Sequence, residues 1–134
     1  NMWIIGGHDL KRPENIEAFK GVDYVVEQGT SGIWTYRKWN SGKTELWGIS
    51  KIELKTTAAE ENSALGLSSE YNWTIPSGFL TYTHGAVLSI NDKLCWIGRV
   101  GVATDKLVFQ VFRTTSYSGA ATPWVNAYVF GQWK

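Results

Sequence analysis

The chain has few of the residue types that build metal, redox and catalytic centres. Its 134 residues include a single cysteine, Cys95, which excludes an intramolecular disulfide. Cys95 lies in the apolar run Leu94–Ile97, where a small buried side chain is a better interpretation than a nucleophile. The two histidines, His8 and His84, have no carboxylates at a recognisable ligand spacing. The sequence therefore predicts no metal site and no cofactor.

Excess charge and long hydrophobic runs are also missing. Thirteen basic and 12 acidic residues leave a net charge of +1, and the lysines and arginines are scattered along the chain, so a nucleic-acid partner is disfavoured. The longest apolar stretches, such as Met2–Ile5 and Leu107–Phe109, are far too short to cross a bilayer. We therefore expect no membrane insertion, and a chain of this length suits one domain with its own core.

Aromatic residues and glycine are plentiful, with eight tryptophans, six tyrosines and 14 glycines beside few helical patterns. Alternating apolar runs separated by Gly, Asn and Asp predict strands over 22–28, 33–39, 44–49, 50–55, 70–75, 79–83, 86–90, 94–103, 106–114 and 124–133. We expect an all-β fold, an antiparallel β-sandwich or jelly-roll-like barrel over 21–134, in which the three strands from 86 to 114 form a meander. Residues 1–20 are expected to form a short neck, in which the residues after Pro13 are expected to make two helical turns.

The segment Gly42-Lys43-Thr44 resembles the end of a phosphate-binding loop, but the rest of that motif is missing. A phosphate loop needs a glycine five residues before its Gly-Lys pair, and here that position holds Arg37. The residues that follow, Thr44–Ile49, alternate like a strand and do not begin a helix. We therefore interpret the segment as a hairpin turn between two aromatic strands.

The hairpin also predicts a register. If Trp39 lies opposite Thr44, then three further cross-strand pairs follow, namely Lys38 with Glu45, Tyr36 with Trp47, and Trp34 with Ile49. An opposite-charge pair beside two aromatic or apolar pairs would favour this register over a slipped one.

Three strand glutamates are candidates for a catalytic pair of carboxylates, namely Glu27, Glu45 and Glu53. Glutamates that face water beside lysines are the simpler interpretation, and no nucleophile or base accompanies them. We expect the protein not to be an enzyme, with a polysaccharide depolymerase as the alternative.

The aromatic residues divide by their expected location. Strand tryptophans are expected in the core or at a subunit interface, namely Trp34, Trp39, Trp47, Trp96 and Trp133. Four aromatics fall in or beside expected loops and are candidate ligand contacts, namely Tyr71, Trp73, Tyr117 and Trp124. An aromatic ring flanked by Asn, Ser and Thr can stack on a sugar while its neighbours bind the hydroxyls. Local packing is the alternative for each of the four.

Three stretches, Asp23–Gly29, Gly32–Gly42 and Glu45–Gly48, together with the ending Tyr128–Trp133, resemble the C-terminal domains of bacteriophage tail-fibre and minor structural tail proteins. The resemblance implies a β-rich tip domain of a virion tail appendage. It also implies a homotrimer, carried by a preceding fibre stalk, that recognises the host cell surface and its polysaccharide. The alternatives are a monomeric carbohydrate-binding module of a bacterial hydrolase and a purely structural tail or baseplate assembly domain.

Overall fold

The computed structural model describes residues 4–5, 8–9, 22–58, 64–114 and 121–134. These residues form strands and connecting segments, with no helix among them. The strands are β1 (Ile4–Ile5), β2 (His8–Asp9), β3 (Val25–Ser31), β4 (Trp34–Trp39), β5 (Lys43–Lys51), β6 (Thr56–Ala58), β7 (Leu65–Ser68), β8 (Tyr71–Thr74), β9 (Tyr82–Ile90), β10 (Cys95–Val102), β11 (Lys106–Thr114) and β12 (Trp124–Gln132). Of the predicted neck, 1–20, only β1 and β2 lie within the described residues.

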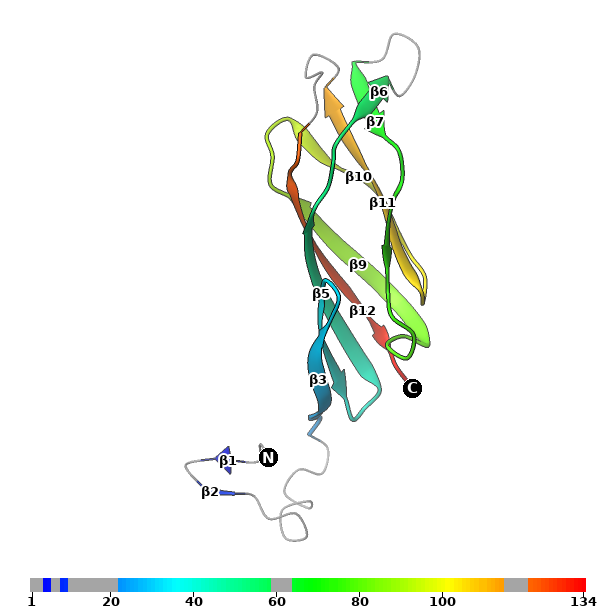
Figure 1. The fold of residues 1–134 in the computed structure, drawn as a ribbon. Helices are drawn as coiled ribbons and strands as arrows, with labels where there is room; N and C mark the ends of the chain where they lie inside the picture. Colours follow the sequence, from blue (N-terminus) through cyan, green and yellow to red (C-terminus); the bar gives the residue numbers. More distant parts are fainter. Residues whose placement is uncertain (1–3, 6–7, 10–21, 59–63, 115–120) are drawn as a thin grey trace.

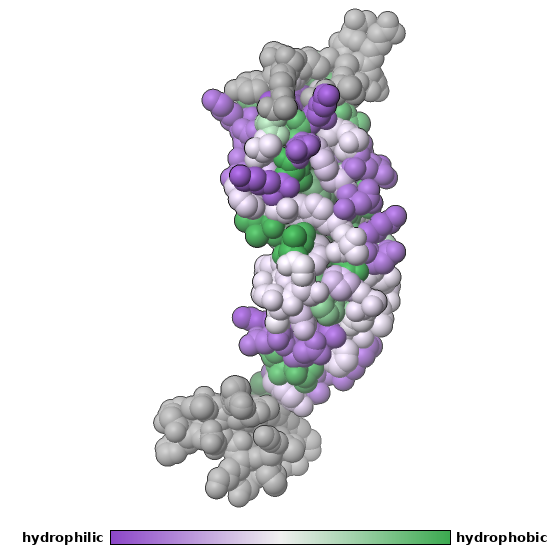
Figure 2. Space-filling model, viewed as in Figure 1, coloured by the Kyte–Doolittle hydropathy of each residue, from purple (hydrophilic) through white to green (hydrophobic). Residues whose placement is uncertain are grey.

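Two five-stranded antiparallel sheets make up the domain (Figure 1). The first has the order β3-β4-β5-β12-β9, so the C-terminal strand lies inside it. The second has the order β10-β11-β7-β6, and β8 pairs with the opposite end of β11 from β7. The sheets are not closed into a barrel, so the predicted β-sandwich is confirmed and the jelly-roll-like alternative is not adopted. Figure 2 shows one side of this body, where hydrophilic side chains surround smaller hydrophobic patches.

The core lies between the two sheets and follows the period-two pattern of the strands. On β11, Leu107, Phe109 and Val111 point inward, and on β12 so do Val125 and Val129; all five are fully buried. Each side chain of this kind contributes about 1.5–3 kcal/mol through burial. Of the five strand tryptophans, Trp34 is buried and Trp96 is exposed, while the others are half-buried, namely Trp39, Trp47 and Trp133.

The predicted register of the β4–β5 hairpin is wrong by one residue. Lys38 lies opposite Thr44, and Arg37 lies opposite Glu45. The cause is the turn: the Gly42 N–H donates to the Trp39 carbonyl at 3.0 Å, and Gly42 has a φ of 102°. A type I turn followed by one residue of positive φ makes a three-residue loop, whereas the predicted register needed four.

This shift replaces every predicted cross-strand pair. Tyr36 faces Leu46 and Trp34 faces Gly48. Lys38 does not meet Glu45, because a one-residue slip sends the two side chains to opposite faces of the sheet. Instead, Lys38 forms an ion pair with Glu27, with 3.6 Å between Nζ and Oε1.

Two glycines that suggested strand ends lie inside continuous strands. Residues 29–31 were expected in a loop but belong to β3, where Gly29 leaves room for the ring of Tyr36. The two strands expected between 79 and 90 are one strand, β9, which contains Gly85 beside a β-bulge. The meander is half right: β10 pairs with β11, but β9 pairs with β12 in the other sheet.

Candidate functional site

A groove opens where the β3–β4 turn meets β8. Its volume is about 400 Å³, and its lining includes Ser31, Gly32, Ile33, Trp34, Ser50, Asn72, Trp73, Thr74 and Pro76. Gly32 has a φ of 60°, which permits the tight two-residue turn after β3. The Trp34 indole N–H donates to the Thr74 carbonyl at 2.8 Å and so fixes β8 against the neighbouring sheet. We call this feature the Trp73 groove.

Exposure alternates along β8, and Asn72, Trp73 and Thr74 all line the groove. Tyr71 and Trp73 are half-buried and contact Phe109, with ring centroids 5.2 Å and 5.1 Å away. The Tyr71 hydroxyl donates to the Glu53 carbonyl at 2.7 Å, and burial raises the pKa of this tyrosine. Asn72 and Thr74 are exposed. The groove therefore offers uncharged amide and hydroxyl groups beside an indole, a combination that suits a neutral polar ligand.

The other two candidate aromatics are not on this strand. Trp124 begins β12 and is 41% exposed, and the Lys51 ammonium lies 5.2 Å from its ring centroid. Its backbone N–H donates to the Asn91 side chain at 2.7 Å. Tyr117 lies outside the described residues. The structure thus brings Tyr71 and Trp73 together on β8 and places Trp124 on the other sheet.

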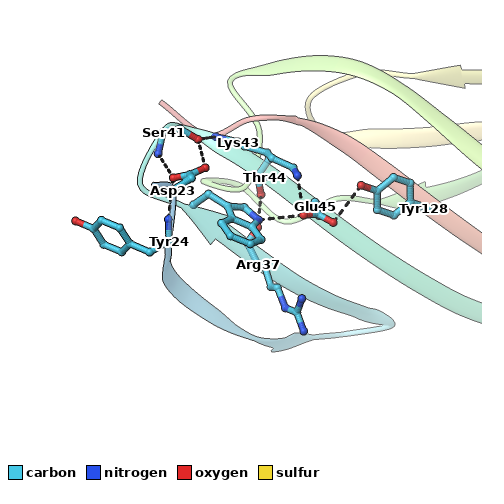
Figure 3. Close-up of polar contacts among 9 residues, drawn as sticks. Asp23, Tyr24, Arg37, Ser41, Lys43, Thr44, Glu45 and Tyr128 are labelled. Atoms are coloured by element: carbon cyan, nitrogen blue, oxygen red, sulfur yellow. Dashed lines mark hydrogen bonds and ion pairs between the residues drawn. The ribbon is translucent and has the colours of Figure 1, made fainter. Parts of the chain in front are cut away.

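Sequence reasoning missed a polar cluster centred on Glu45, which points away from the core yet is only 9% exposed. Its carboxylate accepts hydrogen bonds from the Trp39 indole at 3.0 Å and from the Tyr128 hydroxyl at 3.1 Å (Figure 3). Lys43 adds an ion pair at 3.3 Å. Burial, together with the bond to Glu45, raises the pKa of Tyr128. The cluster ties the β4–β5 turn to β12.

Glu45 does not form a catalytic pair with either of the other two candidate carboxylates. Glu27 aligns with Lys38 and hence with Thr44, so it lies on the opposite face of the sheet from Glu45. Glu45 and Glu53 are eight residues apart, about 26 Å along an extended strand, against the 5–10 Å that glycoside hydrolysis requires. Glu27 is occupied by the Tyr36 hydroxyl at 2.8 Å and by Lys38.

No group of three or more metal-ligating side chains lies within the part of the chain that the structure describes. Cys95 is buried there as predicted, and burial raises the pKa of its thiol. In the same described residues, no helix is long and apolar enough to cross a membrane.

Glu45→Gln tests whether this carboxylate is structural. The amide keeps one acceptor oxygen for two donors and leaves Lys43 without its ion pair, so we expect the free energy of unfolding to fall by about 1–2 kcal/mol. Chemical denaturation measures this, with the exposed Glu53→Gln as the matched control, which is expected to change little. Equal stability of the two variants would contradict the structural role. Loss of reducing-end release from a polysaccharide, without loss of stability, would instead support a depolymerase.

The fold has counterparts among solved structures. It is similar to the fold of pyocin tail fibres, and at 12–16% identity this likeness shows the fold alone. A P. aeruginosa R1 pyocin fibre matches over 94% of this chain with a TM-score of 0.58 and 14% identity. An N-truncated R1-type pyocin tail fibre matches over 92% with a TM-score of 0.57 and 12% identity. An N-truncated R2-type pyocin tail fibre matches over 95% with a TM-score of 0.51 and 16% identity.

The share of each neighbour that is covered differs. The chain spans 33% of the first R1 fibre, 99% of the truncated R1-type fibre and 45% of the R2-type fibre. No protein-family model and no curated protein sequence matches this chain. The likeness therefore supports the fold expected from the tail-fibre resemblance, and the role at the host surface is a separate question.

Proposed function

We propose that this chain is a non-enzymatic tip domain of a tail fibre, which attaches a phage or phage-like particle to its host by binding surface polysaccharide. The observation that carries the proposal is the match of almost the whole domain to the C-terminal part of pyocin fibres. The expected partners are the preceding fibre stalk and further copies of the chain in a homotrimer. The domain would act at the end of the tail, outside the host cell.

The Trp73 groove is the proposed contact with the polysaccharide. Its exposed polar groups are uncharged, so a neutral sugar can exchange its water for Asn72 and Thr74 without desolvating an ion. Trp73 supplies apolar indole surface for the face of a sugar ring, while Tyr71 supports it from the same strand. Two further aromatics are proposed as secondary contacts, namely exposed Trp124 and Tyr117, which lies outside the described residues. A groove this open implies weak binding at each copy, which several linked copies would reinforce.

The test separates binding from folding. Trp73 contacts the core, so its removal would disturb both, whereas Asn72 and Thr74 are exposed. We expect the double variant Asn72→Ala/Thr74→Ala to bind purified host wall polysaccharide about tenfold more weakly, because two hydrogen bonds worth about 0.5–1.5 kcal/mol each are lost. Titration followed by tryptophan fluorescence measures this.

The control is Trp96→Ala, which removes an exposed aromatic from β10, outside the groove, and should leave binding unchanged. Unchanged binding in the double variant would remove the groove from the proposal. If the wild-type chain binds no host polysaccharide in an assay where a known binder succeeds, a purely structural tail or baseplate assembly domain becomes the better interpretation. Binding by a strict monomer would favour a carbohydrate-binding module.

A further inference from the structure

The turn between β4 and β5 contacts both the segment that enters the sandwich and the segment that follows β12. The entering segment, Val22–Tyr24, precedes the edge strand β3, whereas β12 lies between β5 and β9 inside the same sheet. Figure 1 shows that β3 begins and β12 ends at the end of the sandwich where this turn lies. The four residues around the turn, Trp39–Gly42, divide their backbone contacts between the two segments.

Asn40 and Ser41 hold the entering segment. The Asn40 N–H donates to the Tyr24 carbonyl at 2.8 Å. The Asp23 carboxylate accepts hydrogen bonds from the Ser41 hydroxyl, from the Ser41 N–H at 2.9 Å and from the Tyr24 N–H at 3.0 Å (Figure 3). The bond from the Ser41 hydroxyl, aided by those from the two N–H groups, holds the pKa of Asp23 below its usual value. The carboxylate is therefore ionised at neutral pH and its hydrogen bonds are of the strong, charge-assisted kind. We call this set of bonds the Asp23 latch.

Trp39 and Gly42 hold the segment that follows β12. The Trp133 N–H donates to the Gly42 carbonyl at 2.8 Å, and the Trp133 indole N–H donates to the Trp39 carbonyl at 2.8 Å. Gly42 also leaves room for the next residue, because an added Cβ there would be 3.2 Å from the Lys134 carbonyl oxygen. Trp133 therefore joins the turn to β12, which is paired with a neighbouring strand on each side.

We propose that the β4–β5 turn is a load-bearing junction, which passes tension on the entering segment to the interior strand β12 and so protects the edge strand β3 from being peeled off. Only its pairing with β4 holds β3 in the sheet, and a pull on the end of such a strand breaks its hydrogen bonds one after another. The Asp23 latch precedes the first β3 pair, Val25 with Trp39, so tension reaches the turn before it reaches β3. The junction is defined by these contacts alone and does not depend on polysaccharide binding.

The first test asks whether the Asp23 latch and the Trp133 contacts open together. We expect Asp23→Ala to speed hydrogen exchange severalfold at the Ser41 amide and also at the Trp133 amide and indole, measured by NMR relative to β11 amides, which report global unfolding. The matched control is Asp92→Ala. Asp92 also accepts a bond from the next N–H, that of Lys93 at 2.8 Å, but it lies between β9 and β10. The control should leave Trp133 unchanged. Unchanged exchange at Trp133 in Asp23→Ala would overturn the proposal, because the two segments would then be independent.

The second test measures the load directly and uses Asp23→Asn, which keeps one acceptor oxygen and so covers the case in which Asp23→Ala fails to fold. The whole chain is held in optical tweezers by its N-terminus and by a thiol handle introduced with Asn126→Cys, an exposed position on β12, while Cys95 is buried. We expect Asp23→Asn to lengthen by a small step, the release of β3, at a lower force than the Asp92→Asn control, which should behave like the wild-type chain. The same force for the first step in both variants would overturn the proposal.

Discussion

Trp34→Ala is expected to lower the free energy of unfolding by about 3–5 kcal/mol, a large share of the stability of a domain this size. The indole is 1% exposed and meets the edge of Trp73, with 6.1 Å between ring centroids. The indole of Trp34 lies over Gly48, where an added Cβ would be 2.7 Å from the ring. The absence of a side chain on Gly48 therefore leaves room for the indole. Replacement by alanine leaves a cavity and also leaves the Thr74 carbonyl without its donor. Denaturation monitored by circular dichroism measures the loss.

Two further variants separate the causes. Trp34→Phe keeps most of the apolar volume but lacks the N–H, so it should lose less than Trp34→Ala while still loosening β8, which hydrogen exchange at β8 would detect. Trp96→Ala removes a tryptophan that is 42% exposed and should cost well under half as much. Equal losses for Trp34→Ala and Trp96→Ala would show that the link between the sheets contributes little.

The fold class could be predicted because the alternation of side chains is a local property of the sequence. On β11 and β12, alternate side chains such as Phe109 and Val129 are fully buried, as the period-two pattern of a strand requires. The β4–β5 register could not be predicted in the same way, because it depends on the φ of Gly42 and hence on whether the loop holds three residues or four.

The candidate site was predicted in part, for the same reason. Tyr71 and Trp73 were recognised as aromatics beside polar residues, but their half-burial comes from Phe109, which only the pairing of β8 with β11 brings near. The Glu45 cluster joins residues 83 positions apart, Glu45 and Tyr128, and nothing local to Glu45 announces that partner.

Gly131→Ala is the second variant with a large expected effect. Gly131 lies on β12 opposite Thr83, beside the register shift that follows Phe130. A Cβ at this position would be 2.1 Å from the Tyr82 carbonyl oxygen and 2.9 Å from Leu80. The leucine could move, but the carbonyl belongs to the backbone of β9, and its displacement would pull the strand away from β12. Overpacking costs about 1–3 kcal/mol where side chains can adjust, so the loss here should reach the upper end of that range.

Gly101→Ala is the matched control for Gly131→Ala. Gly101 is also a strand glycine, on β10, but an added Cβ there would have no atom within 4 Å. The change should be neutral or stabilise by about 0.4–1 kcal/mol, because alanine restricts the unfolded chain. Urea denaturation of the two variants gives the comparison, and hydrogen exchange should locate the Gly131→Ala effect at β9. Similar stabilities would mean that β9 tolerates displacement.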